Sequence, residues 1–63
     1  MNIIVLGAGN FGTSIANELS VNTFNKVLIF SSNQNKVDEI NRYNTNKFCF
    51  PNKHLNKNLK ATS

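Results

Sequence analysis

The fold of this chain is decided by the stretch IIVLGAGNFGT at residues 3–13. It begins with four consecutive Ile, Val or Leu side chains, which leave no polar face, and such a run is typical of a parallel strand covered by helices on both sides. We therefore expect residues 2–6 to form a strand that is buried on both faces. The glycines that follow place a sharp turn at its carboxyl end, where open α/β sheets bind ligands.

The three glycines have the spacing G-x-G-x-x-G, and each has a separate physical role. Gly7 allows the tight turn out of the strand, Gly9 lets a pyrophosphate approach the backbone, and Gly12 lets the next helix lie close to the strand. Three glycines also occur in ordinary turns, so a turn without a nucleotide is the plainer alternative. The motif gains weight because residues 2–30 supply a strand, a helix and a second strand within about 30 residues.

Residues 10–21 are expected to form the first helix, with Asn10 as its N-cap. One apolar stripe recurs at four-residue spacing and predicts the face that packs on the sheet: Phe11, Ile15 and Leu19, with Ala16 beside them. The side chains predicted to face outward are Ser14, Asn17, Glu18 and Ser20. For Phe11 two interpretations stay open and are compatible, a packing anchor at the helix start and a contact with a bound cofactor.

A second apolar strand is expected at residues 26–30, parallel to the first with a right-handed crossover, since a helix connects the two. A second helix follows at residues 34–42, with Asn33 as N-cap, Val37 and Ile40 inward, and three charged side chains outward: Lys36, Asp38 and Glu39. Residues 44–58 show no regular period, and the apolar island at 48–51 is expected to fold over the sheet edge as a loop. A third strand begins near Leu59. The predicted fold class is α/β, a partial Rossmann dinucleotide-binding fold with a parallel sheet in β-α-β-α-β order.

The length and composition limit what these residues do alone. A chain of 63 residues buries only about 60 per cent of its unfolded surface. We expect residues 1–63 to be the N-terminal part of a dinucleotide-binding domain, with the substrate domain absent. The net charge is +4. Six of the seven basic residues are spread over 25 positions among asparagines, which favours a solvated surface over a nucleic-acid site.

Other residue types exclude further kinds of site. Cys49 is alone, so no internal disulfide forms. No basic segment precedes the first apolar run, which is too short to span a bilayer, so we expect no membrane anchor and a cytoplasmic location. His54 has no partner for a metal or triad set and is expected at the surface. Asp38 and Glu39 are adjacent and diverge on a helix, which argues against a catalytic carboxylate pair.

The residues after the second strand bear on the choice of coenzyme. A carboxylate there accepts hydrogen bonds from the ribose 2′-OH of NAD, whereas an arginine pairs with the 2′-phosphate of NADP. This chain has the neutral residues Ser31, Ser32 and Asn33, with Lys36 one helical turn further on. The pattern slightly favours NADP or the use of both coenzymes.

Two segments resemble bacterial-type NAD(P)-dependent glycerol-3-phosphate dehydrogenases. GAGNFGTSIANEL at residues 7–19 is similar to that family's GAGxWGTALAxxL opening, and FPNKHLNKNLKATS at residues 50–63 is similar to its L-P-G/N-x-x-L-x-x-N-L-x-A-T-S segment. The second segment matches in register without gaps, and the resemblance covers all 63 residues. The second segment is the more specific, because many dehydrogenases share the first.

The resemblance implies a reversible hydride transfer between dihydroxyacetone phosphate and sn-glycerol 3-phosphate, with NAD or NADP, which serves glycerophospholipid synthesis. By position, Asn10 and Phe11 would contact the dinucleotide, and Ser32 and Asn33 would lie at the adenosine ribose. The family's catalytic lysines and phosphate-binding residues lie beyond Ser63, so no residue here is expected to be catalytic and the piece alone is expected to be inactive. A homodimer is left open, and no nucleic-acid partner is expected.

The chain departs from the family pattern at three positions. Phe11 replaces a tryptophan, Ser32 replaces an arginine or histidine, and Cys49 replaces a tyrosine. Two alternative functions stay open, the cofactor half of another two-domain Rossmann dehydrogenase and a small basic module that binds nucleic acid.

Overall fold

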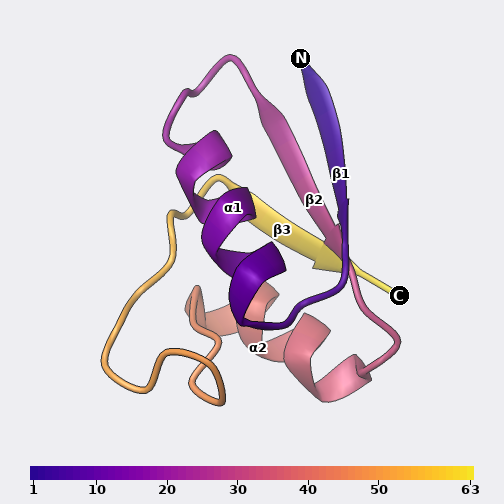
Figure 1. The fold of residues 1–63 in the computed structure, drawn as a ribbon, viewed down its shortest axis with the longest axis vertical. Helices are drawn as coiled ribbons and strands as arrows, with labels where there is room; N and C mark the ends of the chain where they lie inside the picture. Colours follow the sequence, from indigo (N-terminus) through magenta and orange to yellow (C-terminus); the bar gives the residue numbers. More distant parts are fainter.

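Three strands and two helices alternate along the chain, as predicted (Figure 1). The computed structural model describes residues 1–63. The elements are β1 (Asn2–Leu6), α1 (Asn10–Ser20), β2 (Lys26–Phe30), α2 (Gln34–Tyr43) and β3 (Leu59–Thr62). All the strands are parallel and lie in the order β1-β2-β3, so the partial Rossmann architecture is confirmed.

The sheet places the carboxyl ends of the strands at one edge. Leu6 pairs with Phe30, and Phe30 in turn pairs with Thr62, so the three strands end side by side. The turn after β1 and the start of α2 lie at this edge (Figure 1). The register therefore brings the glycine turn next to the residues that follow β2.

The core lies between the two helices and one face of the sheet. Alternate positions of β2 and β3 are buried, and they join buried residues of both helices in one cluster. Its members are Ala8, Ala16, Val27, Ile29, Val37, Ile40, Leu55, Leu59 and Ala61. Since successive side chains of a strand point to opposite faces, both helices cover the same face.

The prediction that the first strand is buried on both faces is wrong. Ile4 is 65% exposed and Leu6 is 79% exposed, whereas Ile3 and Val5 pack against the core. β1 is an edge strand of this sheet, and no helix of the chain covers the face on which Ile4 and Leu6 lie. The apolar run is typical of a strand that is covered on both faces, but the two helices of this chain cover only one face of the sheet.

Helix α1 differs from its prediction in how it starts and which face it buries. Its N-cap is Gly9, without a side-chain cap bond, so Asn10 is the first helical residue and not the cap. Phe11 is 80% exposed and Ile15 is 40% exposed, so the predicted stripe is only partly correct. The buried residues are Thr13, Ala16 and Ser20.

Small side chains form the buried face of α1 because the helix lies close to the sheet. The predicted outward orientation of Ser20 is wrong, since Ser20 is buried and its hydroxyl donates to the Asn17 carbonyl at 2.8 Å. Asn17 is half-buried, and its side-chain oxygen accepts from the amide of Asn56 at 2.6 Å. Asn17 and Ser20, both predicted to face outward, therefore make hydrogen bonds within the chain.

Helix α2 agrees more closely with its prediction. The Asn33 side chain caps it by accepting from the amides of Asn35 and Lys36, and Val37 and Ile40 are buried. The helix runs one residue further than expected and ends before Asn44, which adopts the left-handed conformation with a φ of 56°.

Residues 44–58 form the predicted irregular segment between α2 and β3. It contacts the glycine turn, where the Cys49 sulfur lies 3.8 Å from the Ala8 carbonyl, and α1, where the Asn56 amide donates to Asn17. It also contacts α2, where Glu39 accepts from Thr45 and Lys47. The apolar island lies in an irregular loop, as predicted, with Phe48 85% exposed and Cys49 and Phe50 half-buried. None of the helices has the length and hydropathy needed to cross a membrane.

Candidate dinucleotide-binding site

The glycine turn begins directly at the end of β1. The Gly7 amide donates to the Phe30 carbonyl at 2.8 Å, which joins the turn to the end of β2. Gly7 has a φ of 102°, in a region that side chains other than glycine rarely adopt. The predicted role of Gly7 in a sharp turn is therefore confirmed.

Gly12 is required by the packing of α1 on the turn. A Cβ at Gly12 would overlap the carbonyl oxygen of Gly7 and would lie 3.5 Å from Cγ1 of Val5. The helix can approach the strand this closely only without a side chain, as predicted.

Gly9 is free of such internal constraints. Its φ is −80°, and a Cβ at this position would have no atom within 4 Å. The fold itself would accept a side chain here, so the space in front of Gly9 is open to a ligand. This is the geometry that a pyrophosphate needs in order to reach the backbone.

The start of α1 offers free hydrogen-bond donors beside Gly9. The first backbone bond of the helix runs from the Thr13 amide to the Gly9 carbonyl at 3.0 Å. The amides of Asn10, Phe11 and Gly12 precede that bond and have no partner in the helix. Free amides at a helix N-terminus attract a phosphate group.

The residues after β2 lie beside this turn, but their side chains have different surroundings. Ser31 is buried, and its hydroxyl accepts from the Asn33 amide at 3.1 Å. The Asn33 side chain is engaged as the cap of α2. Ser32 is exposed. Of the two residues predicted at the ribose, Ser32 thus has the hydroxyl available to a ligand. The amide, the carbonyl and the side-chain oxygen of Asn33 are all bonded within the chain.

Lys36 reaches the glycine turn from α2, although it was predicted to face outward. Its ammonium lies 3.4 Å from the Ala8 carbonyl and 5.1 Å from the centroid of the Phe48 ring. A positive charge is thereby held next to the glycine turn.

Asn46 is the residue at this site that sequence reasoning missed. It is fully buried, and its side-chain nitrogen donates to the Ala8 carbonyl at 3.0 Å and to the Thr13 hydroxyl at 3.1 Å. It connects the segment after α2 to both the glycine turn and α1. One asparagine in a chain with thirteen, in a segment without a period, carries no signal that would have singled it out.

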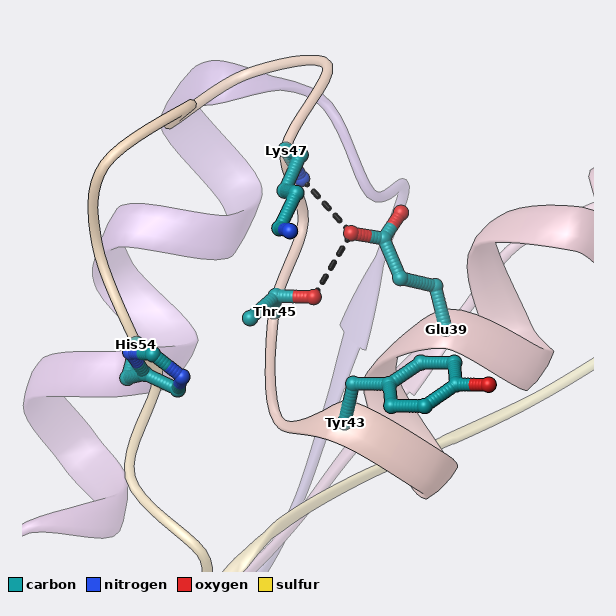
Figure 2. A pocket seen from close by; sticks show the side chains of 5 residues that line it. All are labelled: Glu39, Tyr43, Thr45, Lys47 and His54. Atoms are coloured by element: carbon teal, nitrogen blue, oxygen red, sulfur yellow. Dashed lines mark hydrogen bonds between the residues drawn. The ribbon is translucent and has the colours of Figure 1, made fainter.

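A separate hollow of about 510 Å³ lies between α2 and the segment that follows it (Figure 2). It is lined by Glu39, Tyr43, Thr45, Lys47 and His54. The Glu39 carboxylate accepts from the Thr45 hydroxyl at 2.7 Å and from the Lys47 amide at 2.8 Å. These bonds fasten the segment to α2. No group of His, Cys, Asp and Glu is arranged to hold a metal, and His54 is exposed as predicted.

A parallel β-α-β-α-β sheet, a glycine turn at the carboxyl end of its first strand and a helix N-terminus with free amides define a dinucleotide-binding unit of the Rossmann class. A family model described as "NAD-dependent glycerol-3-phosphate dehydrogenase N-terminus" matches residues 2–63. The chain belongs to this family, as the resemblance of its two segments predicted.

The relatives found by comparison are similar over nearly the whole chain. A glycerol-3-phosphate dehydrogenase [NAD(P)+] of Mesoplasma florum is 40% identical over 62 residues, 98% of this chain and 18% of the relative. The enzyme of Neorickettsia sennetsu is 44% identical over 63 residues, 100% of this chain and 19% of the relative. That of Staphylococcus aureus strain JH9 is 44% identical over 61 residues, 97% of this chain and 18% of the relative.

The chain spans less than a fifth of the length of these curated relatives. No solved structure matches it.

Proposed function

We propose that residues 1–63 are the N-terminal part of a dinucleotide-binding domain, and that they bind the coenzyme of a glycerol-3-phosphate dehydrogenase. The full-length protein would interconvert sn-glycerol 3-phosphate and dihydroxyacetone phosphate with NAD or NADP. The relatives carry this activity in their names. The observation that carries the proposal is Gly9, where the fold leaves open space beside free helix amides.

The residues proposed to bind the coenzyme divide into two groups. Around the pyrophosphate are Gly7, Gly9, Asn10, Phe11 and Gly12, and at the adenosine ribose are Ser32 and Asn33. The first group acts mainly through backbone amides and the absence of side chains, because phosphate oxygens bond well to N–H groups at a helix start. The exposed Phe11 ring can lie along the dinucleotide.

The coenzyme supplies the hydride chemistry, and these residues only bind and orient it. The chain spans less than a fifth of the length of its relatives. Substrate binding and proton transfer are therefore assigned to residues outside these 63.

The test uses the full-length protein with NADPH or NADH and dihydroxyacetone phosphate, following the loss of reduced coenzyme. Activity is expected in the natural protein, and Gly9→Val is expected to abolish it by blocking the pyrophosphate. The variant should stay folded, because a Cβ at Gly9 meets nothing. Asn52→Val, at an exposed loop position, is the control.

Two results would count against the proposal. Normal activity in Gly9→Val would remove the glycine turn from the coenzyme site. If NAD+ or NADP+ were reduced with a different hydroxy acid or alcohol, and dihydroxyacetone phosphate caused no oxidation of NADH or NADPH, the result would support another two-domain Rossmann dehydrogenase.

A further inference from the structure

We propose that Asn46 is a positioning residue, which fixes the direction of the Gly9 amide so that its N–H group meets the pyrophosphate of the coenzyme. This inference rests on the proposed function, since it concerns the same glycine turn. It adds a residue 37 positions further along the chain than Gly9.

The contacts of Asn46 are specific to the glycine turn. Its side-chain nitrogen uses both of its hydrogens, one on the Ala8 carbonyl at 3.0 Å and one on the Thr13 hydroxyl at 3.1 Å. Asn46 and Thr13 are both fully buried, and Ala8 is 5% exposed. No water competes for these bonds, so they hold the turn and the first turn of α1 in one arrangement.

The geometry of the peptide bond transmits this contact to Gly9. The Ala8–Gly9 peptide is trans, and in a trans peptide the C=O and N–H groups point in opposite directions. Because the Ala8 carbonyl points inward to Asn46, the N–H group of Gly9 points outward. Gly9 is exposed there and has no neighbour in front of a Cβ.

Further donors on the Ala8 carbonyl act in the same sense. The Lys36 ammonium lies at 3.4 Å and the Cys49 sulfur at 3.8 Å from its oxygen. Hydrogen bonds to a carbonyl polarise the peptide and make its N–H group a stronger donor. Asn46 provides the shortest of the three contacts and is the only fully buried donor.

Two observations separate this role from simple packing. The side-chain oxygen of Asn46 is buried without a hydrogen-bond partner, which is unfavourable for folding and would be avoided by an apolar residue. In addition, both neighbours of Asn46 are held by one carboxylate, because Glu39 accepts from the Thr45 hydroxyl and the Lys47 amide (Figure 2). The backbone around Asn46 is therefore fixed while its amide nitrogen is directed to the turn.

The experiment measures ligand affinities of the full-length protein and of its variants. Asn46→Leu keeps the branched shape of the side chain but removes both donors. It is expected to weaken binding of NADPH and of ADP-ribose by about tenfold, the effect of one misdirected bond to a charged group. Binding of adenosine, which lacks the pyrophosphate, should stay unchanged.

A matched control separates positioning from stability. Ile40→Val trims a fully buried side chain of α2 and should lower the melting temperature without changing any of the three affinities. If Asn46→Leu fails to fold, Glu39→Ala takes its place. Glu39 is half-buried, and its removal releases Thr45 and Lys47 beside Asn46. The same loss of affinity for NADPH and ADP-ribose, but not for adenosine, is expected.

Each outcome decides one of the proposals. The positioning role would be overturned if Asn46→Leu bound NADPH and ADP-ribose as tightly as the natural protein does, or if it lost as much affinity for adenosine. Either result would leave the proposed function intact. The same results in Glu39→Ala would overturn the positioning role where that variant is used. Failure of the unmodified protein to bind ADP-ribose or NADPH would overturn both proposals.

Discussion

Gly12 meets the carbonyl oxygen of Gly7 so closely that a Cβ on Gly12 would overlap it. The turn that carries this oxygen is joined to the end of β2, because the amide of Gly7 donates to the Phe30 carbonyl at 2.8 Å. The turn therefore needs both glycines: Gly7 because of its positive φ, and Gly12 because a side chain there would meet Gly7. Gly9 between them has no such internal partner.

The first prediction separates the two kinds of glycine. Gly12→Ala should lower the free energy of unfolding by about 1–3 kcal/mol, since the added methyl group meets fixed backbone. Gly9→Ala should change it by no more than about 0.5 kcal/mol, as is usual at open surface positions. Urea denaturation of both variants checks the difference. Equal stability of Gly12→Ala and the natural chain would show that the helix can move away from the turn.

The second prediction concerns Phe11, for which packing and ligand contact were both left open. The ring is 80% exposed, so Phe11→Ala should alter the free energy of unfolding by less than about 0.5 kcal/mol. Affinity for NADPH should fall about two- to tenfold, the range of an aromatic contact. Phe11→Trp, which keeps an aromatic ring, should retain binding. A large loss of stability with normal affinity would assign Phe11 to packing instead.

The third prediction concerns the choice of coenzyme. The residues directly after β2 are the neutral Ser31, Ser32 and Asn33. The Lys36 ammonium lies beside the turn, in a hollow that also holds Glu39. Lys36→Met should weaken NADPH binding about three- to tenfold more than NADH binding, because only NADPH carries a 2′-phosphate. The difference should shrink at high salt. Lys57→Met, at an exposed loop position, is the control, and an equal effect on both coenzymes would contradict the expectation.

The fourth prediction concerns the uncovered face of the sheet. Leu6 is 79% exposed beside Ile4, so Leu6→Gln should reduce the binding of a hydrophobic dye to the 63-residue chain while its stability changes by less than about 0.5 kcal/mol. Ile29→Ala, on the covered face and fully buried, should cost about 2–5 kcal/mol. Dye fluorescence and urea denaturation measure the two effects. Unchanged dye binding in Leu6→Gln would mean that this face does not take up apolar molecules.

The sequence carried enough information for the element order and for the role of two glycines. β2 lies at the predicted residues 26–30, and α2 begins after the predicted cap Asn33. These features depend on local rules, namely apolar runs, cap residues and φ angles. Local rules are visible in a single sequence.

The failures come from relations between distant residues. Burial of Ile4 and Leu6 depends on which layers are present, and the run of apolar residues cannot report that. Ser20, which was expected to face outward, is buried because α1 lies close to the sheet, where a small polar side chain fits better than a large apolar one. Asn46 depends on a contact across 38 residues with Ala8, for which no sequence pattern exists.

The distance along the chain between Ala8 and Asn46 also sets an order of events during synthesis. The first βαβ unit can assemble as soon as β2 has left the ribosome, because its contacts are between neighbouring elements. The Ala8 carbonyl obtains its buried donor only when the chain has been extended beyond α2. A nascent chain that ends before Asn46 would therefore contain every glycine of the motif, but its Gly9 amide would not yet be oriented to bind phosphate.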